Sequence, residues 1–250
     1  MSWYKTARRN MYQAVAKEIT TYIFKRFKKL GADEEYYHLL SPQIYEIIQD
    51  VVKDKSDMWD ILSSMYVEYT FKDMDAGDKF NIVAGMNTVL ELNVKILVDL
   101  VTINTKPEQI YKDFYYRLYS AILHEMEHSR QVRDKTLNQD YVSMQSAPQM
   151  YELLNNYRTY LLQNIEIEAF AIGIYRASIS QNKDIETSIR EYASNVLMDI
   201  DENRIKEILF RKGKIDEAPD VLNFRKQIID EFVMKVTTYL KGRFPNFRTV

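Results

Sequence analysis

The sequence predicts an α+β protein that is mostly helical, with a small antiparallel three-stranded sheet packed on a long helix. Glycine and proline are scarce, at 6 and 5 in 250 residues, which leaves few turns and favours long helices. Most of the chain repeats apolar side chains every three or four positions, which is the helical period. One stretch, residues 66–96, alternates apolar and polar side chains instead, as half-buried strands do.

The first 64 residues are expected to form an N-terminal helical region. Residues 3–30 carry one apolar stripe at helical spacing, and Gly31 is expected to end that helix. Two shorter helical pieces, divided near Ser41-Pro42, are expected within residues 33–64.

Three strands are expected next, over residues 66–74, 80–84 and 90–96, with turns between them. The third strand has the clearest alternation, with its apolar side chains on the buried side. Consecutive strands joined by short turns predict an antiparallel meander.

The rest of the chain is expected to be helical. Pro107 stands where the first turn of a helix tolerates proline. The apolar periodicity predicts helices over residues 108–130, 151–179, 184–210 and 218–241. The predicted regions are an N-terminal helical region (1–64), a metal-binding core (65–180) and a C-terminal helical region (181–250), which together are expected to form one compact unit.

The composition limits the classes of function. With 46% hydrophobic residues, the chain can bury a large core. It has no cysteine, which excludes disulfides, iron–sulfur clusters and thiolate catalysis. The chain has no run of about 18 apolar residues, so no membrane span is predicted, and no secretory signal is visible. The expected location is the cytoplasm or a macromolecular assembly.

The net charge of −2 hides a basic N-terminal segment. Residues 1–30 hold eight Lys and Arg and one Glu, a charge of +8 − 1 = +7. Such a helix could contact an acidic protein or a polyanion. The alternative is a solvated helix face that packs on the protein's own acidic body.

The strongest motif is His124-Glu125-Met126-Glu127-His128. Residues four apart share one helix face, so both histidines can bind one metal ion. Glu125 lies about 100° round the helix, where it can reach a metal-activated water without binding the metal. Zn²⁺ lowers the pKa of such a water to about 7. Random placement would give this pattern in roughly 0.3% of chains with this composition.

A zinc site with two histidines needs a third protein ligand. The third histidine, His38, is far upstream and is interpreted as a partly buried structural residue. Glu166 and Glu168 lie among apolar residues further along the chain, about 200° apart on a helix, so only one of them can face the metal. Glu166 is preferred because Ala169 and Gly173, on its face, permit a close approach of helices. An interhelical ion pair is the alternative role for Glu166.

These residues resemble the gluzincin branch of the zinc metallopeptidases, in which an HExxH motif is followed tens of residues later by ExxA. Here the second motif is Glu166-Ile167-Glu168-Ala169. The resemblance implies a zincin-like core, with Zn²⁺ bound by His124, His128 and Glu166 and with Glu125 as general base.

The resemblance also implies that an extended substrate adds to the edge of the sheet. The third predicted strand is the candidate, through Leu90, Leu92 and Val94. Such families also supply a side chain that stabilises the oxyanion. The candidates for that role are Tyr157, Arg158 and Tyr160.

One residue departs from the family pattern. Phe170 stands where many members have an Asp or Asn that supports a metal-bound histidine. Another acid or a backbone carbonyl is therefore expected to orient that imidazole.

Three functions follow as hypotheses. The first is a zinc-dependent peptidase that hydrolyses peptides or proteins. The second is a structural or assembly protein, for example of a phage-like virion, that retains a zincin-like fold with its metal bound or lost. The third is nucleic-acid binding through residues 1–30, where no groove-reading motif is visible.

Overall fold

A computed structural model describes residues 3–29, 35–53, 61–72, 80–87, 90–99, 108–133, 149–197 and 200–244. The chain divides into two compact units, Met1–Leu137 and Asn138–Val250. This division falls inside the predicted region 65–180. The expected helix end at Gly31, the turn between the first two predicted strands and the helix start at Pro107 lie outside the described residues.

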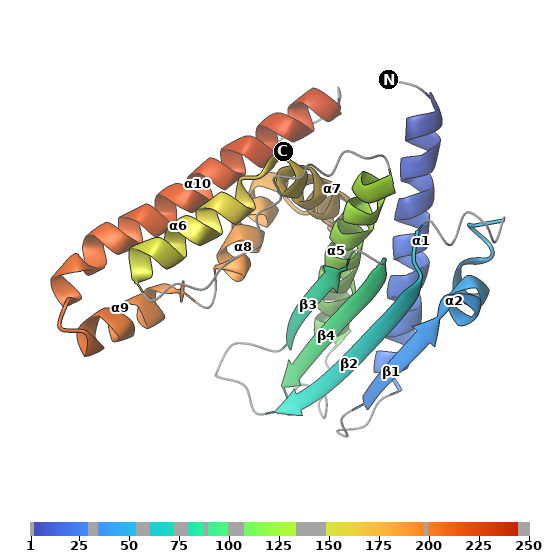
Figure 1. Cartoon of the computed structure of the whole chain (residues 1–250), viewed down its shortest axis with the longest axis horizontal. Coiled ribbons are helices and arrows are strands. Elements are labelled where there is room, and N and C mark those ends of the chain that lie inside the picture. Colours follow the sequence, from blue (N-terminus) through green and yellow to red (C-terminus); the bar gives the residue numbers. More distant parts are fainter. Residues whose placement is uncertain are drawn as a thin grey trace. The chain divides into compact units, whose positions relative to one another are not determined.

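The first unit combines helices with one sheet, as the α+β prediction requires (Figure 1). Its elements are α1 (Trp3–Phe27), β1 (Glu35–Leu40), α2 (Ser41–Ile48), β2 (Ser64–Lys72), β3 (Phe80–Met86), β4 (Glu91–Asp99) and α5 (Glu108–Arg133). The three strands predicted within residues 66–96 are confirmed as β2, β3 and β4.

The sheet is mixed and four-stranded, with the order β1-β2-β4-β3. The predicted three-stranded antiparallel meander is therefore wrong. β2 pairs in parallel with β4, while β1 and β3 pair antiparallel on the outside. The parallel pair aligns buried residues of both strands, such as Val67 with Val94 and Tyr69 with Ile96. This register gives the sheet one continuous apolar face, and the alternation along a single strand does not predict which strands join to form it.

Helices α1 and α5 cover that apolar face (Figure 1). The Tyr69 hydroxyl of β2 donates to the Ile23 carbonyl of α1 at 3.0 Å. Burial raises the pKa of Tyr69, so the phenol stays protonated. The Phe27 ring of α1 stacks on Phe114 of α5, with centroids 4.1 Å apart. Phe80 of β3 meets Phe114 edge-on at 5.4 Å, so sheet and both helices share one aromatic core.

Residues 35–40 form a strand, so the helical piece predicted there is wrong. β1 pairs along its whole length with β2, which satisfies backbone groups that a helix would otherwise satisfy internally. Its tyrosines, Tyr36 and Tyr37, have high strand propensity. The predicted division at Ser41-Pro42 is confirmed, since α2 begins at Ser41 with Pro42 in its first turn.

The second unit is entirely helical in the part of it that the structure describes (Figure 1). Its elements are α6 (Met150–Leu161), α7 (Asn164–Gln181), α8 (Ile185–Val196), α9 (Glu202–Arg211), the 3₁₀ turn η2 (Ile215–Glu217) and α10 (Ala218–Arg243). α10 packs against α6, α7, α8 and α9, and its residues Ile228, Phe232 and Val236 lie in the core.

Two of the long helices predicted in this unit are each divided. The backbone turns at Leu162 and Gln163 between α6 and α7, and the segment around Asp201 separates α8 from α9. Neither break contains glycine or proline, so the sequence carried no strong stop signal. No described helix is long and apolar enough to cross a membrane.

Candidate metal centre

The second half of α5 is buried around most of its circumference. Among the described residues, the buried side chains that carry a carboxylate, a guanidinium or an imidazole are His124, Glu125, Glu127, Arg130 and Glu166. Charged groups are rarely buried unless they are paired or bind a metal. The burial of these charged and polar groups therefore points to the same segment, His124 to His128, that the sequence motif indicated.

The two histidines of the motif point their Nε2 atoms toward each other. These atoms are 3.0 Å apart, and the imidazole rings are nearly perpendicular, at 89°. Two imidazole nitrogens bound to one tetrahedral Zn²⁺ stand about 3.3 Å apart. A metal ion that bound both nitrogens would require only a small widening of this pair.

Glu125 lies beside this pair without taking part in it. One oxygen of its carboxylate is 3.7 Å from His124 Nε2, and its side chain is buried. Glu125 is not a member of the group of three residues that could hold a metal ion.

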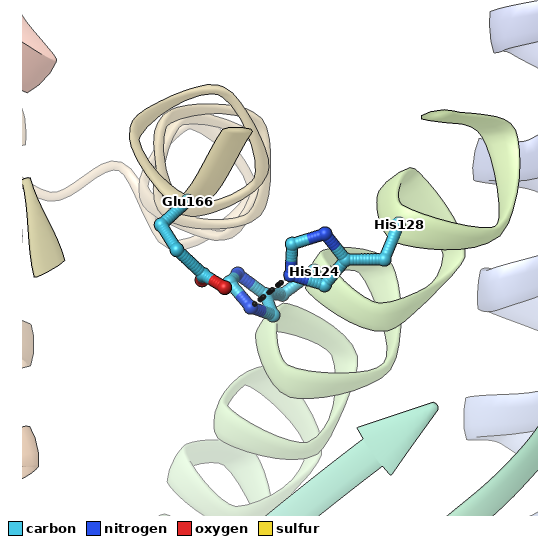
Figure 2. A group of neighbouring side chains, drawn as sticks. All are labelled: His124, His128 and Glu166. Atoms are coloured by element: carbon cyan, nitrogen blue, oxygen red, sulfur yellow. Dashed lines mark hydrogen bonds between the residues drawn. The ribbon is translucent and has the colours of Figure 1, made fainter. Parts of the chain in front are cut away.

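Glu166 is fully buried on α7. Figure 2 shows His124, His128 and Glu166 turned toward one another. The three side chains each offer one ligand atom, these atoms lie within 4.8 Å of one another, and the group could hold a metal ion. Glu166, which the sequence analysis preferred over Glu168, is the carboxylate of this group.

Glu168, the alternative third ligand, has a different role. Its carboxylate accepts a hydrogen bond of 2.7 Å from the Tyr239 hydroxyl of α10. Glu166 and Glu168 lie on opposite sides of α7. The bond from Tyr239 therefore holds the Glu168 side of α7 against α10, within the second unit.

Sequence reasoning missed Gln131. Its amide oxygen lies 2.8 Å from Nδ1 of His128, and the residue is fully buried. The sequence predicted that another acid or a backbone carbonyl supports a histidine, because Phe170 cannot. Phe170 belongs to the core of the second unit, where it contacts the rings of Tyr192 and Phe232. The available signal was a glutamine three residues after the second histidine, on the same helix face.

Two further contacts hold this part of α5. The Ser129 hydroxyl donates to the Ile61 carbonyl at 2.7 Å, which fixes the motif to the segment before β2. Arg130 donates through two nitrogens to one oxygen of Glu127, at 2.9 and 2.7 Å. These contacts reduce the freedom of the helix turn that carries His128.

The strand proposed to hold substrate is not an edge strand. β4 is paired on both sides, with β2 and β3, and Leu92 and Val94 are fully buried. Leu90 precedes β4 in a turn and has a left-handed backbone, with φ of 60°. The prediction that Leu90, Leu92 and Val94 hold an added strand is therefore wrong. The backbone groups of Leu92 and Val94 pair within the sheet, and those of Leu90 bond to Ser63 and Asn87.

The oxyanion candidates lie on α6. Arg158 forms an ion pair of 2.8 Å with Glu231 of α10. Tyr157 is buried in the core of the second unit, and Tyr160 packs against it. These contacts give all three a role in packing α6, and their assignment to an oxyanion stays a prediction.

The remaining histidine and the basic helix make contacts within the first unit. His38 is exposed on β1 rather than partly buried, with Nε2 3.9 Å from Glu91. On α1, Arg26 is paired with Glu35 and lies 4.2 Å over the Tyr37 ring. Lys28 lies 4.7 Å over the ring of Phe24. Arg26 and Lys28 therefore contact aromatic rings of their own protein.

No protein-family model, no curated protein and no solved structure matches the chain. The resemblance to gluzincins thus depends on the two motifs alone, and the case for a function depends on the geometry of the site.

Proposed function

We propose that the protein is a zinc-dependent metallopeptidase that uses His124, His128 and Glu166 as metal ligands and Glu125 as general base. The observation that carries this proposal is the arrangement on α5. Two Nε2 atoms are 3.0 Å apart, and a carboxylate oxygen that is not one of the three ligands lies 3.7 Å from one of them.

The donor set favours zinc among the common metals. Two imidazoles and one carboxylate match the ligands of catalytic zinc sites, which keep a fourth position for water. Ca²⁺ and Mg²⁺ prefer sets made of oxygen atoms alone. Zinc bound there would supply a Lewis acid and lower the pKa of the attacking water.

The chain's own residues would perform the proton transfers. The Glu125 carboxylate would accept a proton from water as the water oxygen forms a bond to the peptide carbonyl carbon. When the C–N bond breaks, the same group would return that proton to the leaving amine. Burial of Glu125 strengthens its electrostatic interactions during both transfers.

In this function, β3 would be the strand to which an extended substrate adds. Within the described sheet β3 is paired only with β4, so its outer backbone groups can accept an extended peptide. β3 also packs against α5, through Phe80 and Phe114, and α5 carries the motif. A peptide on that edge would run along the strand that contacts the metal-binding helix.

The deep burial of the site favours a second function. His124, Glu125 and Glu166 are at most 8% exposed. A buried metal with little access for substrate would suit a structural protein, in which the ion stabilises the fold. This second candidate predicts bound metal without hydrolysis.

The test uses three variants of the whole chain and elemental analysis of the purified protein. His128→Ala should abolish binding of zinc, whereas His38→Ala, which removes an exposed histidine, should keep about one zinc per chain. Glu125→Gln should keep the metal and lower cleavage of a peptide library by about 10²–10⁴-fold. Wild-type protein without zinc after reconstitution would refute both functions. Bound zinc with no cleavage by the wild type would favour the structural function, and full activity of Glu125→Gln would exclude Glu125 as the base.

A further inference from the structure

Gln131 is a buried polar residue that neither the motif nor the proposed reaction uses. It follows His128 by three positions on α5, so the two side chains share one face of the helix. Its amide oxygen Oε1 lies 2.8 Å from Nδ1 of His128. The residue is fully buried, and the contact is therefore shielded from competition with water.

The chemistry of this contact decides which ring nitrogen of His128 can bind a metal. An amide oxygen only accepts hydrogen bonds, so the proton of a neutral imidazole is held on Nδ1. The lone pair then lies on Nε2, which is the nitrogen that faces His124 at 3.0 Å. The same bond restricts rotation of the ring, which keeps Nε2 directed at the same point.

We propose that Gln131 is a positioning residue for His128, which fixes the tautomer and the orientation that metal binding requires. This inference rests on the proposed zinc site. Gln131 takes the role that was predicted for another acid or a backbone carbonyl, because Phe170 cannot support a histidine. A neutral amide orients the imidazole but raises its basicity less than a carboxylate would.

Three substitutions separate this role from simple packing. Gln131→Leu keeps a buried side chain of similar size and removes the acceptor. Gln131→Asn keeps the amide and shortens it by one methylene, so that the oxygen no longer reaches Nδ1. Gln131→Glu keeps an acceptor oxygen at the same reach and adds a negative charge. Thr20→Ala is the control, because it removes a different fully buried polar group, a hydroxyl on α1, from the same unit.

The measurement is the zinc dissociation constant of each full-length variant, from competition with a chromophoric chelator. Unfolding of the metal-free protein is followed in parallel. Gln131→Leu and Gln131→Asn should weaken zinc binding by about 10–100-fold. Gln131→Glu should bind zinc as tightly as the wild type or more tightly, and Thr20→Ala should bind as the wild type does.

The outcomes distinguish this inference from the proposed function. A wild-type chain that binds no zinc refutes the proposed function and this role with it. If the wild type binds zinc and both Gln131→Leu and Gln131→Asn bind it equally well, only the positioning role is overturned. If Gln131→Leu does not fold, Gln131→Asn decides the question. A loss of affinity in Gln131→Glu as large as in Gln131→Asn would also overturn the role, because an acceptor would then make no difference.

Discussion

Phe114→Ala removes a fully buried ring from the place where α1, α5 and the sheet meet. The ring stacks on Phe27 at 4.1 Å and meets Phe80 edge-on at 5.4 Å. Truncation of a buried Phe costs about 3–5 kcal/mol, because transfer free energy is lost and a cavity remains. Domains of this size unfold with about 5–15 kcal/mol, so the loss is a large part of the total.

The assay is urea unfolding followed by far-ultraviolet circular dichroism, which reports on the helices of both units. Phe210→Ala is the control, because that side chain is 73% exposed and its loss should change stability by no more than about 0.5 kcal/mol.

The same variant tests whether core and metal site are separable. Phe114 precedes His124 by ten residues, which is about 15 Å along the helix. Sites this far apart usually contribute independently, so folded Phe114→Ala should keep the zinc affinity of the wild type. A loss of stability below about 1 kcal/mol would refute the inferred core, and a large loss of zinc affinity would refute its independence from the site.

Three other predictions test the sheet, a helix cap and the response to acid. Val94→Asp, on a fully buried side chain of the central strand β4, should prevent folding of the first unit. Val83→Asp, on the 58% exposed side chain of β3, should leave the circular dichroism spectrum unchanged, and equal effects of the two substitutions would contradict the assignment of buried and exposed side chains in the sheet. Asp201 accepts a backbone hydrogen bond at the start of α9, so Asp201→Ala should lower the free energy of unfolding by about 1 kcal/mol in urea, and no change would refute the cap. Hydrogen bonds from Ser64 and, to a smaller extent, Asn93 lower the pKa of Glu91 in the folded protein. The ionised carboxylate therefore stabilises the fold at a pH above the pKa that Glu91 has in the unfolded chain. This contribution is lost as the pH falls through the lower pKa of the folded protein. Ser64→Ala should therefore be less stable than the wild type above about pH 5, and the difference should shrink below about pH 4.3; a constant difference would exclude linkage to Glu91.

The local features of the fold could be predicted because they depend on neighbours along the chain. The stripe of α1, the alternation of β4 and the spacing of His124 and His128 each follow from the period of one element. The buried residues of β4 were predicted correctly for the same reason. The prediction that β4 is an edge strand was wrong, because its position in the sheet depends on which strands pair with it.

The features that were missed depend on partners far along the chain. β1 is a strand because β2 satisfies its backbone groups, and no local pattern specifies that pairing. The parallel pairing of β2 with β4 depends on matching apolar faces across the sheet. The bend between α6 and α7 has no glycine or proline, and it follows from the packing of each helix against α10.

The sequence by itself determined that two imidazoles and a carboxylate share one helix, since an α-helix fixes the positions of residues one turn apart. It also limited the candidates for a third ligand to two glutamates of one helix. Only the tertiary structure shows that Glu166 is fully buried and that Glu168 accepts a bond from Tyr239, because both features depend on packing between helices. It also decided that Gln131 faces Nδ1 of His128, since the rotamers of both side chains depend on the buried surroundings of α5.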